Sequence, residues 1–331
     1  MKKGIAIAGN MIVDDVKYVE AFPPRHTLMT ITHSVRSTGG LACNCLIDLA
    51  RLDPALPLKA IGIVGEDDAG DYIIRQLAMH PSIDMSRVLR RGTTSYTDVM
   101  TEPDGGRTFF HYRGANALLK PEHFDFSNLE ADIIHMGYVL LLDGLDAGDP
   151  EYPTAMCRVL DSAQKAGIAT SIDVVSEHGE RFNKLVPPAL AYTDYCIINE
   201  IEAALTVGLP IRESSGNLLE RNLPEVCSRL MGLGVGRWVV LHMPELSCGL
   251  ERGGGFVTER SWNLPDGFIK SSVGAGDAFA STVLYSAYRG WGLRDALCYA
   301  GAVAAFSLSG AGACDAIGRL PDIMAKMEAL R

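Results

Sequence analysis

A short stretch near the C-terminus, Lys270–Ala280 (KSSVGAGDAFA), combines small residues with a single carboxylate. Gly274, Ala275 and Gly276 leave the backbone open to close approach, and Asp277 follows them directly at the start of a helical pattern. Backbone N–H groups at such a helix start, together with the helix dipole, bind anions. We also expect them to lower the pKa of Asp277, so that its carboxylate is ionised at neutral pH.

An anion site beside an ionised carboxylate suits the transfer of a phosphoryl group to an alcohol. Asp277 would take the proton from the attacking hydroxyl, and the amides of 274–277 would stabilise the charge on the phosphoryl group in transit. An Asp that only stabilises a helix N-terminus after a glycine turn would give the same four residues, so both interpretations are open at this point. The stretch lacks the G-K-[ST] of a Walker A loop, and the N-terminal AIAGNMIVD lacks the G-x-G-x-x-G of a dinucleotide site.

Further polar residues follow buried, strand-like segments, at the places where open α/β sheets bind their ligands. Asp14 could accept hydrogen bonds from two adjacent hydroxyls, although an exposed loop acid would look the same. Gly39 and Gly40 precede a helical pattern that carries Asn44, whose amide can both donate and accept; a flexible helix entry with a polar first turn is the alternative. Asp173 ends another buried segment, and it could contact a substrate or support the residues beneath the phosphates.

Asn199 and Glu202 have the spacing of a capping box, in which two side chains cap the N-terminus of one helix. The same geometry places a carboxylate near the carboxyl edge of the sheet, where Mg²⁺ and its waters could bridge phosphates. The two roles are compatible. We expect Glu202 to act on the metal through water, without direct ligation.

Apolar segments of strand length alternate with helical patterns along most of the chain, which predicts a mainly parallel sheet covered by helices on both faces. The expected strands are GIAIAG, LKAIGIVG, ADIIHMGYVLL, IATSIDVV, DYCIIN and RWVVLHM. The expected helices are CNCLIDLARL, AGDYIIRQLAM, TAMCRVLDSAQKAG, EIEAALTVG, LPEVCSRLMGLG, AFASTVLYSAYRG and LRDALCYAGAVAAFSLSG. The last two end at Gly290 and Gly310, where a C-cap belongs. Small residues at 300–305 could pack tightly or admit a flat ligand.

Two segments break this alternation and predict a small antiparallel sheet. Residues 95–112 contain two strand-prone runs joined by a Pro-Asp-Gly-Gly turn, and residues 11–36 alternate Thr, Val and Ile with polar residues. Such a sheet would project from the main domain as a lid, a dimer surface or both. His111, Tyr96 and Phe110 on the hairpin could close over a substrate, or the aromatic residues could pack within the lid or a dimer.

Composition limits the partners of the chain. Its 331 residues exceed the usual single-core size of roughly 250–300, so we expect one large domain with an accessory piece, or two domains. The formal charge of −10 argues against nucleic acid or an anionic membrane as the main partner. Eight cysteines without C-x-x-C or zinc spacing predict reduced thiols in a cytoplasmic protein. The apolar N-terminus stops at Asp14-Asp15 without a cleavage site, which favours a buried strand over a signal peptide.

Together these motifs resemble a known family. SSVGAGDAFAS is similar to the C-terminal signature of ribokinase-like (PfkB) carbohydrate kinases, and other motifs of that family recur in order over nearly the whole chain. These motifs are GNMIVDD, STGGLACN, GEDDAG, RGANALL and INEIEA. The resemblance implies a three-layer α/β/α sandwich with a mainly parallel sheet over residues 1–331. It also implies a small antiparallel lid formed by residues 11–36 and 93–113.

The resemblance further implies an ATP- and Mg²⁺-dependent sugar kinase that acts on a sugar hydroxyl, the primary one by preference. Asp277 would be the general base, and the amides of Gly274, Ala275, Gly276 and Asp277 would form the anion hole. The residues carried into the sugar site are Asp14, Gly39, Gly40, Asn44 and Asn116. The residues assigned to the nucleotide phosphates and Mg²⁺ are Asn199 and Glu202. A homodimer through the β lid is also implied.

The sequence departs from the family pattern in three places. Leu41 replaces a polar residue of relatives such as ribokinase, and Ser271-Ser272 replaces an Asp-Thr pair that supports a monovalent-cation site. Met243-Pro244-Glu245 replaces a glycine-rich nucleotide turn. A nucleoside kinase of the same fold is an alternative, which would need an apolar slot beside Asp14. A non-catalytic sugar-binding regulatory protein is another alternative, and the intact G-A-G-D argues against it.

Overall fold

The computed structural model describes residues 2–176 and 180–330, which form a nine-stranded sheet and a second, four-stranded one. The large sheet has the strand order β13-β12-β11-β10-β9-β8-β1-β4-β5. Its strands are β1 (Ile5–Gly9), β4 (Leu58–Val64), β5 (Ile83–Arg90), β8 (Ile133–Val139), β9 (Ala169–Val174), β10 (Tyr195–Asn199), β11 (Trp238–His242), β12 (Leu246–Glu251) and β13 (Phe256–Arg260). Neighbouring strands from β11 to β5 run parallel, and β12 and β13 form an antiparallel edge.

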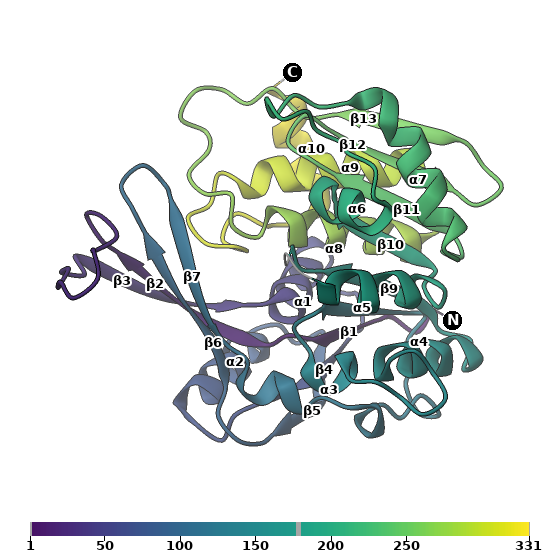
Figure 1. The fold of residues 1–331 in the computed structure, drawn as a ribbon, viewed down its shortest axis with the longest axis horizontal. Helices are drawn as coiled ribbons and strands as arrows, with labels where there is room; N and C mark the ends of the chain where they lie inside the picture. The colour runs from purple at the N-terminus through teal and green to yellow at the C-terminus, as the bar shows by residue number, and fades with distance from the viewer. Residues whose placement is uncertain (1, 177–179, 331) are drawn as a thin grey trace.

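Helices cover both faces of the large sheet (Figure 1), which confirms the expected three layers. One face packs against α1 (Leu41–Leu52), α2 (Asp68–Ala78), α8 (Ala275–Arg289), α9 (Leu293–Ser307) and α10 (Leu320–Glu328). The other packs against α3 (Asp143–Asp146), α4 (Ala155–Lys165), α5 (Glu180–Leu190), α6 (Glu200–Val207) and α7 (Leu223–Gly232). Along β1, Ile5 and Ile7 belong to one core and Ala6 and Ala8 to the other, as the two-residue period of a strand requires.

The small sheet projects from the main body (Figure 1) and has the order β3-β2-β6-β7. Its strands are β2 (Ile12–Tyr18), β3 (His33–Gly39), β6 (Ser95–Thr101) and β7 (Arg107–Tyr112). The β2–β3 and β6–β7 pairs are antiparallel, whereas the central β2–β6 pair is parallel. The register places Ser37, Asp14, Thr97 and His111 opposite one another in a single row across the four strands.

Two helix boundaries differ from the expected ones. Helix α8 begins at Ala275, three residues before the expected start, because Gly274 takes the left-handed N-cap conformation (φ 78°) and the following Ala and Gly join the first turn. Gly290 caps its C-terminus as expected, with φ 81°. Helix α9 ends at Ser307 with Leu308 as its C-cap, so Gly310 does not cap it. No helix in the described part of the chain is long and apolar enough to cross a membrane.

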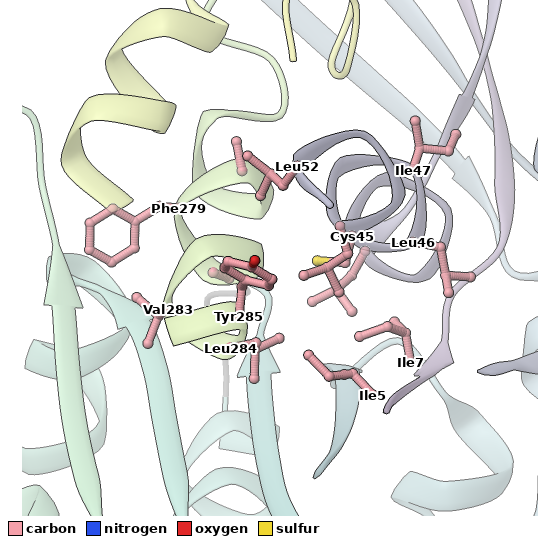
Figure 2. Close-up of a cluster of buried hydrophobic side chains, with 14 of the residues drawn as sticks. Ile5, Ile7, Cys45, Leu46, Ile47, Leu52, Phe279, Val283, Leu284 and Tyr285 are labelled. Carbon is pink, nitrogen blue, oxygen red and sulfur yellow. The ribbon is translucent and has the colours of Figure 1, made fainter. Parts of the chain in front are cut away.

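Helices α1 and α8 lie against each other above β1 (Figure 2). The buried side chain of Cys45 on α1 lies between the two helices (Figure 2), and its Sγ is 3.7 Å from the backbone oxygen of Asp277 on α8. A fully buried free cysteine packs as a small apolar side chain, so this contact helps to hold the two helices together. It fixes the N-terminal turns of α1 and α8, which carry Asn44 and Asp277, next to each other.

Candidate functional site

A crevice of about 280 Å³ opens at the carboxyl ends of β8, β9, β10 and β11, where parallel sheets place their ligands. Three carboxylates line it, those of Asp173, Glu202 and Asp277. Gly274 and Gly276 of the glycine turn line it as well. The structure therefore brings together the turn, the candidate base and the capping-box acid that the sequence had singled out separately.

Two side chains from other parts of the fold hold the buried carboxylate of Asp277. The Asn44 Nδ2 donates to Oδ2 at 2.7 Å, and the Tyr138 hydroxyl donates to Oδ1 at 2.9 Å. Burial raises the pKa of Asp277, and these two hydrogen bonds lower it part of the way back. The expected lowering by the amides of the turn is therefore wrong, because desolvation dominates and no backbone N–H of the described residues bonds to this carboxylate.

The first turn of α8 leaves backbone donors open. Its N-cap, Gly274, offers no side-chain oxygen, and the first N–H bonded within the helix is that of Ala278, at 2.8 Å from the Gly274 carbonyl. The N–H groups of Gly276 and Asp277 have no hydrogen-bond partner among the described residues, and that of Ala275 makes one contact of 3.5 Å. Open N–H groups at a helix N-terminus form an anion site.

Glycine is required at the start of this turn. Gly274 has φ 78°, and a Cβ there would lie 2.6 Å from both the Cβ and the carbonyl oxygen of Ala313. Contacts shorter than 3 Å force the backbone to move, so any side chain at 274 would displace the turn.

Asn199 and Glu202 form the capping box that their spacing predicts. The Asn199 Oδ1 accepts from the N–H groups of Ile201 and Glu202 at 2.9 and 3.0 Å, and the Glu202 Oε2 accepts from the Asn199 N–H at 3.0 Å. Burial raises the pKa of Glu202 to about 7. Burial also raises the pKa of Asp173, and the charges on Glu202 and Asp277 raise it further.

The residues around Glu202 fit Mg²⁺ held through water. Both carboxylate oxygens already accept hydrogen bonds, Oε1 from the Ser176 hydroxyl at 2.8 Å and Oε2 from Asn199. No group of three or more His, Cys, Asp or Glu in the described residues is placed to hold a metal ion directly. Asp173 and Asp277 add further hard carboxyl oxygens to the crevice, and a bound cation would offset the like-charge repulsion that helps to raise the pKa of Asp173.

An apolar cleft of about 430 Å³ adjoins the crevice. Met243, Leu246 and Phe279 form part of its walls. Ala304 and Ala305 of α9 line it too, whereas Ala300 and Ala302 of the same run are fully buried, so the small residues at 300–305 both pack tightly and border the cleft. The cleft and the crevice share two lining residues, Gly276 and His242.

Asp14 lies at the base of the small sheet, on β2. Gly39 packs directly against its carboxylate, since a Cβ at position 39 would lie 2.0 Å from Oδ2. Burial raises the pKa of Asp14 to about 6; a hydrogen bond with Thr97 lowers it, and the charge of Asp277 adds to the rise. In the same row, the Thr97 hydroxyl lies 3.0 Å from His111 Nδ1. Because the charge of Asp277 contributes to the raised pKa of Asp14, the two carboxyl groups are close enough to interact.

Gly40 and Asn116 have structural contacts. Gly40 is the N-cap of α1 with φ 77°, and a Cβ there would lie 2.5 Å from the Asn10 carbonyl oxygen. Asn116 is fully buried, and its amide accepts from the N–H of Met11 and donates to the C=O of Met11, both at 3.2 Å. Asn116 thus holds the connection between β1 and β2, and the structure does not place it among the residues that line the crevice.

The sequence interpretation missed Tyr138. This residue is part of the crevice wall at the end of β8, and its N–H donates to Asn10 Oδ1 at 2.6 Å. Its position at the carboxyl end of a buried strand, where ligands bind, was the available signal. An apolar run such as ADIIHMGYVLL does not show which of its residues reaches the sheet edge.

Comparisons with known proteins agree with this geometry. The sequence matches the family described as pfkB family carbohydrate kinase over residues 2–318. An ATP-dependent ribose-1-phosphate kinase of Halopiger xanaduensis is 28% identical over 200 residues, which span 60% of this chain and 62% of that relative. A 5-dehydro-2-deoxygluconokinase of Clostridium perfringens is 25% identical over 278 residues, which span 81% of this chain and 77% of the relative.

Solved structures share the fold at low sequence identity. Arabidopsis thaliana ribokinase, complexed with ribose and ATP, has a TM-score of 0.80 and 19% identity, and the alignment covers 99% of both chains. A Methanocaldococcus jannaschii nucleoside kinase has a TM-score of 0.73 and 18% identity, with 99% of this chain and 98% of that chain covered. At these identities the likeness shows the architecture of the two sheets and their helices.

Proposed function

This chain belongs to the pfkB family of carbohydrate kinases, and from that premise we propose that it transfers the γ-phosphate of ATP to a sugar hydroxyl, with Asp277 as general base. One observation carries the proposal. The Asp277 carboxylate, held by Asn44 and Tyr138, lies beside the open N–H groups at the N-terminus of α8. This arrangement supports a proton acceptor next to an anion site in one crevice.

On the acceptor side, Asp277 takes the proton of the sugar hydroxyl as its oxygen attacks phosphorus. Because burial raises the pKa of Asp277, its ionised form is a stronger base than an exposed aspartate. Asp14 accepts hydrogen bonds from other hydroxyls of the sugar, with Gly39, Gly40 and Asn44 shaping the same side of the site. Asn116 contributes by holding the chain next to Met11.

On the donor side, the amides of Gly274–Asp277 stabilise the charge on the transferred phosphoryl group. One donor of this kind contributes about 10²–10³-fold to the rate in other enzymes. Mg²⁺, held through water by Glu202 with Asn199 orienting that carboxylate, would offset the charge of the nucleotide phosphates. The apolar cleft receives the nucleotide base, and the small sheet, as the lid of residues 11–36 and 93–113, closes over the sugar.

The test is phosphoryl transfer from ATP across a panel of sugars, sugar phosphates and nucleosides, with Asp277→Asn as the decisive variant. We expect kcat to fall by about 10²–10⁴-fold, the usual contribution of a general base. Asp295→Asn is the matched control, because Asp295 has the same position in the first turn of another glycine-capped helix, α9, but is exposed. If wild type and Asp277→Asn act equally slowly on every compound, Asp277 is not the base.

The same panel decides between a sugar and a nucleoside as acceptor. The nucleoside alternative has support from the shared fold with the M. jannaschii enzyme. It requires faster turnover of a nucleoside than of any free sugar or sugar phosphate.

A homodimer through the small sheet also belongs to the proposal. Phe22, Phe109 and Phe110 are exposed there, and the rings of Phe22 and Phe110 stack with centroids 6.2 Å apart. Sedimentation velocity should show a dimer that Phe110→Glu dissociates; a wild-type monomer at assay concentrations would end this part of the proposal.

A further inference from the structure

A third cavity, of about 380 Å³, shares no lining residue with the crevice or the apolar cleft. Its walls come from three segments, which are the end of α1 with Pro54, residues 79–82 after α2, and residues 317–319 before α10. The basic side chains of Arg51, His80 and Arg319 line it, and none of the described residues around it is Asp or Glu. Because the whole chain has a formal charge of −10, a cavity of this kind indicates a site for an anion.

Several hydrogen-bond donors of this cavity are unused. The exposed side chain of Arg319 has no hydrogen bond or salt bridge within the described part of the chain. Arg51 donates from Nη1 to the Cys314 carbonyl at 2.5 Å, which leaves further N–H groups of its guanidinium to offer. The backbone N–H groups of Gly318 and Arg319 also have no partner among the described residues. A ligand with several acceptor oxygens would satisfy these donors together.

The two half-buried basic groups of the cavity influence each other. Burial lowers the pKa of His80, and the positive charge of Arg51 lowers it further. The His80 ring is therefore mainly neutral at neutral pH and offers one N–H donor. An anion bound beside both side chains would offset the effect of the Arg51 charge on His80.

The rest of the wall favours a ligand with an organic part. Pro54, Met79 and Pro81 add apolar surface, and the volume is within the range of small-molecule sites, about 300–1,000 Å³. A phosphate group presents several oxygens to guanidinium groups and forms strong, charge-assisted hydrogen bonds with them. The cavity therefore fits a small organic molecule that carries a phosphate group.

A series of contacts connects this cavity to the proposed base. Cys314, whose carbonyl accepts from Arg51, has its Sγ 3.7 Å from the Asn44 carbonyl oxygen. Asn44 in turn donates to the Asp277 carboxylate at 2.7 Å. Arg51 is thus both part of the cavity wall and a support of the segment that contacts Asn44.

We propose that this cavity is a regulatory site that binds a small organic molecule through its phosphate group. Arg51 and Arg319 bind the phosphate, with His80 as a further donor. A ligand that draws Arg51 toward itself changes the support of Cys314 and, through it, the position of Asn44. This inference goes beyond the proposed function and does not require phosphoryl transfer. Basic side chains that only interact with solvent are the competing explanation.

The test is an NMR titration with phenyl phosphate at constant ionic strength, without turnover. The ring signals of His80, assigned by their loss in His80→Gln, report binding at the cavity itself. Arg319→Gln should weaken phenyl phosphate binding by about 10-fold, the effect of one hydrogen bond to a charged group. The matched control is Arg221→Gln, which removes an exposed arginine from η3 (Glu220–Asn222) outside the cavity and should leave the dissociation constant within about twofold of wild type. Phenol, which lacks the phosphate, should leave the His80 signals in place.

The side-chain amide signals of Asn44 test the connection to the base. They should move with the same dissociation constant as the His80 signals, and Arg319→Gln should weaken both responses together. Phenyl phosphate bound only at the first turn of α8 would instead move the Asn44 signals with a constant that Arg319→Gln leaves unchanged. That result, an Asn44 or His80 signal that stays in place, an equal response to phenol, or equal losses for Arg319→Gln and Arg221→Gln would overturn the inference. A protein that phosphorylates no sugar but shows both responses would reject the transfer reaction and keep this site.

Discussion

Two helix N-termini border the same crevice and are built in opposite ways. Helix α6 begins after Asn199, whose side chain accepts from the N–H groups of the first turn, and Glu202 closes the box from the third helical position. Helix α8 begins after Gly274, which has no side chain to offer, and its third helical position is Asp277. The acid at the third position therefore caps its own helix in α6, and in α8 it is held by Asn44 and Tyr138 instead.

The difference shows how the N-cap residue decides whether the first N–H groups of a helix are open to a ligand. The dipole and the N–H groups are the same in both helices, but in α6 the side chains of the cap have already bonded two of them. In α8 the N–H groups of Gly276 and Asp277 have no partner among the described residues. The proposed anion site depends on residue 274 having no side chain that could cap the helix.

The largest effect on activity is expected from placing a side chain at position 274, because it would displace the open first turn of α8. Gly274→Ala puts a Cβ at 2.6 Å from Ala313 in a left-handed backbone, so we expect the turn to shift, with about 1–3 kcal/mol lost in stability and kcat reduced about 100-fold or more. Urea unfolding and steady-state kinetics measure the two effects.

The matched control is Gly290→Ala at the other end of α8. Gly290 has nearly the same backbone (φ 81°) with nothing within 4 Å of a Cβ. Gly290→Ala should lower the free energy of unfolding by about 1 kcal/mol and leave kcat unchanged. A kinetic loss as large as that of Gly274→Ala would mean that the first turn has no special role.

Removing the Tyr138 hydroxyl, which donates to Asp277, should reduce activity less than the change at Gly274. It tests whether Asp277, unlike Glu202, depends on partners from outside its own helix. Because the Tyr138 hydrogen bond lowers the pKa of Asp277, Tyr138→Phe should raise it. A base that protonates at higher pH moves the acid limb of kcat/KM upward, by about 0.5–1 pH unit, with kcat at pH 8 reduced by less than about tenfold.

Tyr152→Phe tests whether any Tyr–Asp pair would do the same. Tyr152 donates to Asp161 Oδ2 at 2.5 Å, outside the crevice, so its removal should leave the pH profile in place. An acid limb that stays fixed in Tyr138→Phe would show that Asp277 does not set it.

Removing the cap of α6 should have the smallest effect on activity. Asn199→Ala removes the side chain that accepts from Ile201 and Glu202, and we expect a loss of about 1 kcal/mol in the free energy of unfolding, measured in urea. Kcat should change by only a few fold, since the open amides are on α8.

Thr154→Ala removes an N-cap hydrogen bond from α4, at 3.2 Å to the Cys157 N–H, away from the crevice. Thr154→Ala should lower the free energy of unfolding by about as much as Asn199→Ala and leave kcat and KM unaltered. If Asn199→Ala abolishes activity while Thr154→Ala does not, Asn199 acts on the nucleotide or Mg²⁺ directly.

Much of the fold could be predicted from local patterns. The alternation of buried segments with helical patterns identified β1, β4, β8, β9, β10 and β11, because a strand buried on both faces is apolar at nearly every position. The hairpin of β6 and β7 and the capping box of α6 were likewise predicted, since both depend on residues a few positions apart. Strands β12 and β13 were not predicted: β12 (LSCGLE) mixes small and polar residues although most of them are buried, and β13 is half-exposed.

By itself, the sequence determined the glycine turn, the acid that follows it and the absence of a capping side chain at the start of α8. These features depend on consecutive residues and their backbone preferences. The tertiary structure decided the surroundings of that acid. Asn44 and Tyr138 reach Asp277 from 233 and 139 residues away. The burial that raises the pKa of Asp277 comes from tertiary packing such as that of α1 against α8. Desolvation is a property of the assembled interior, so no local pattern could give the direction of that shift.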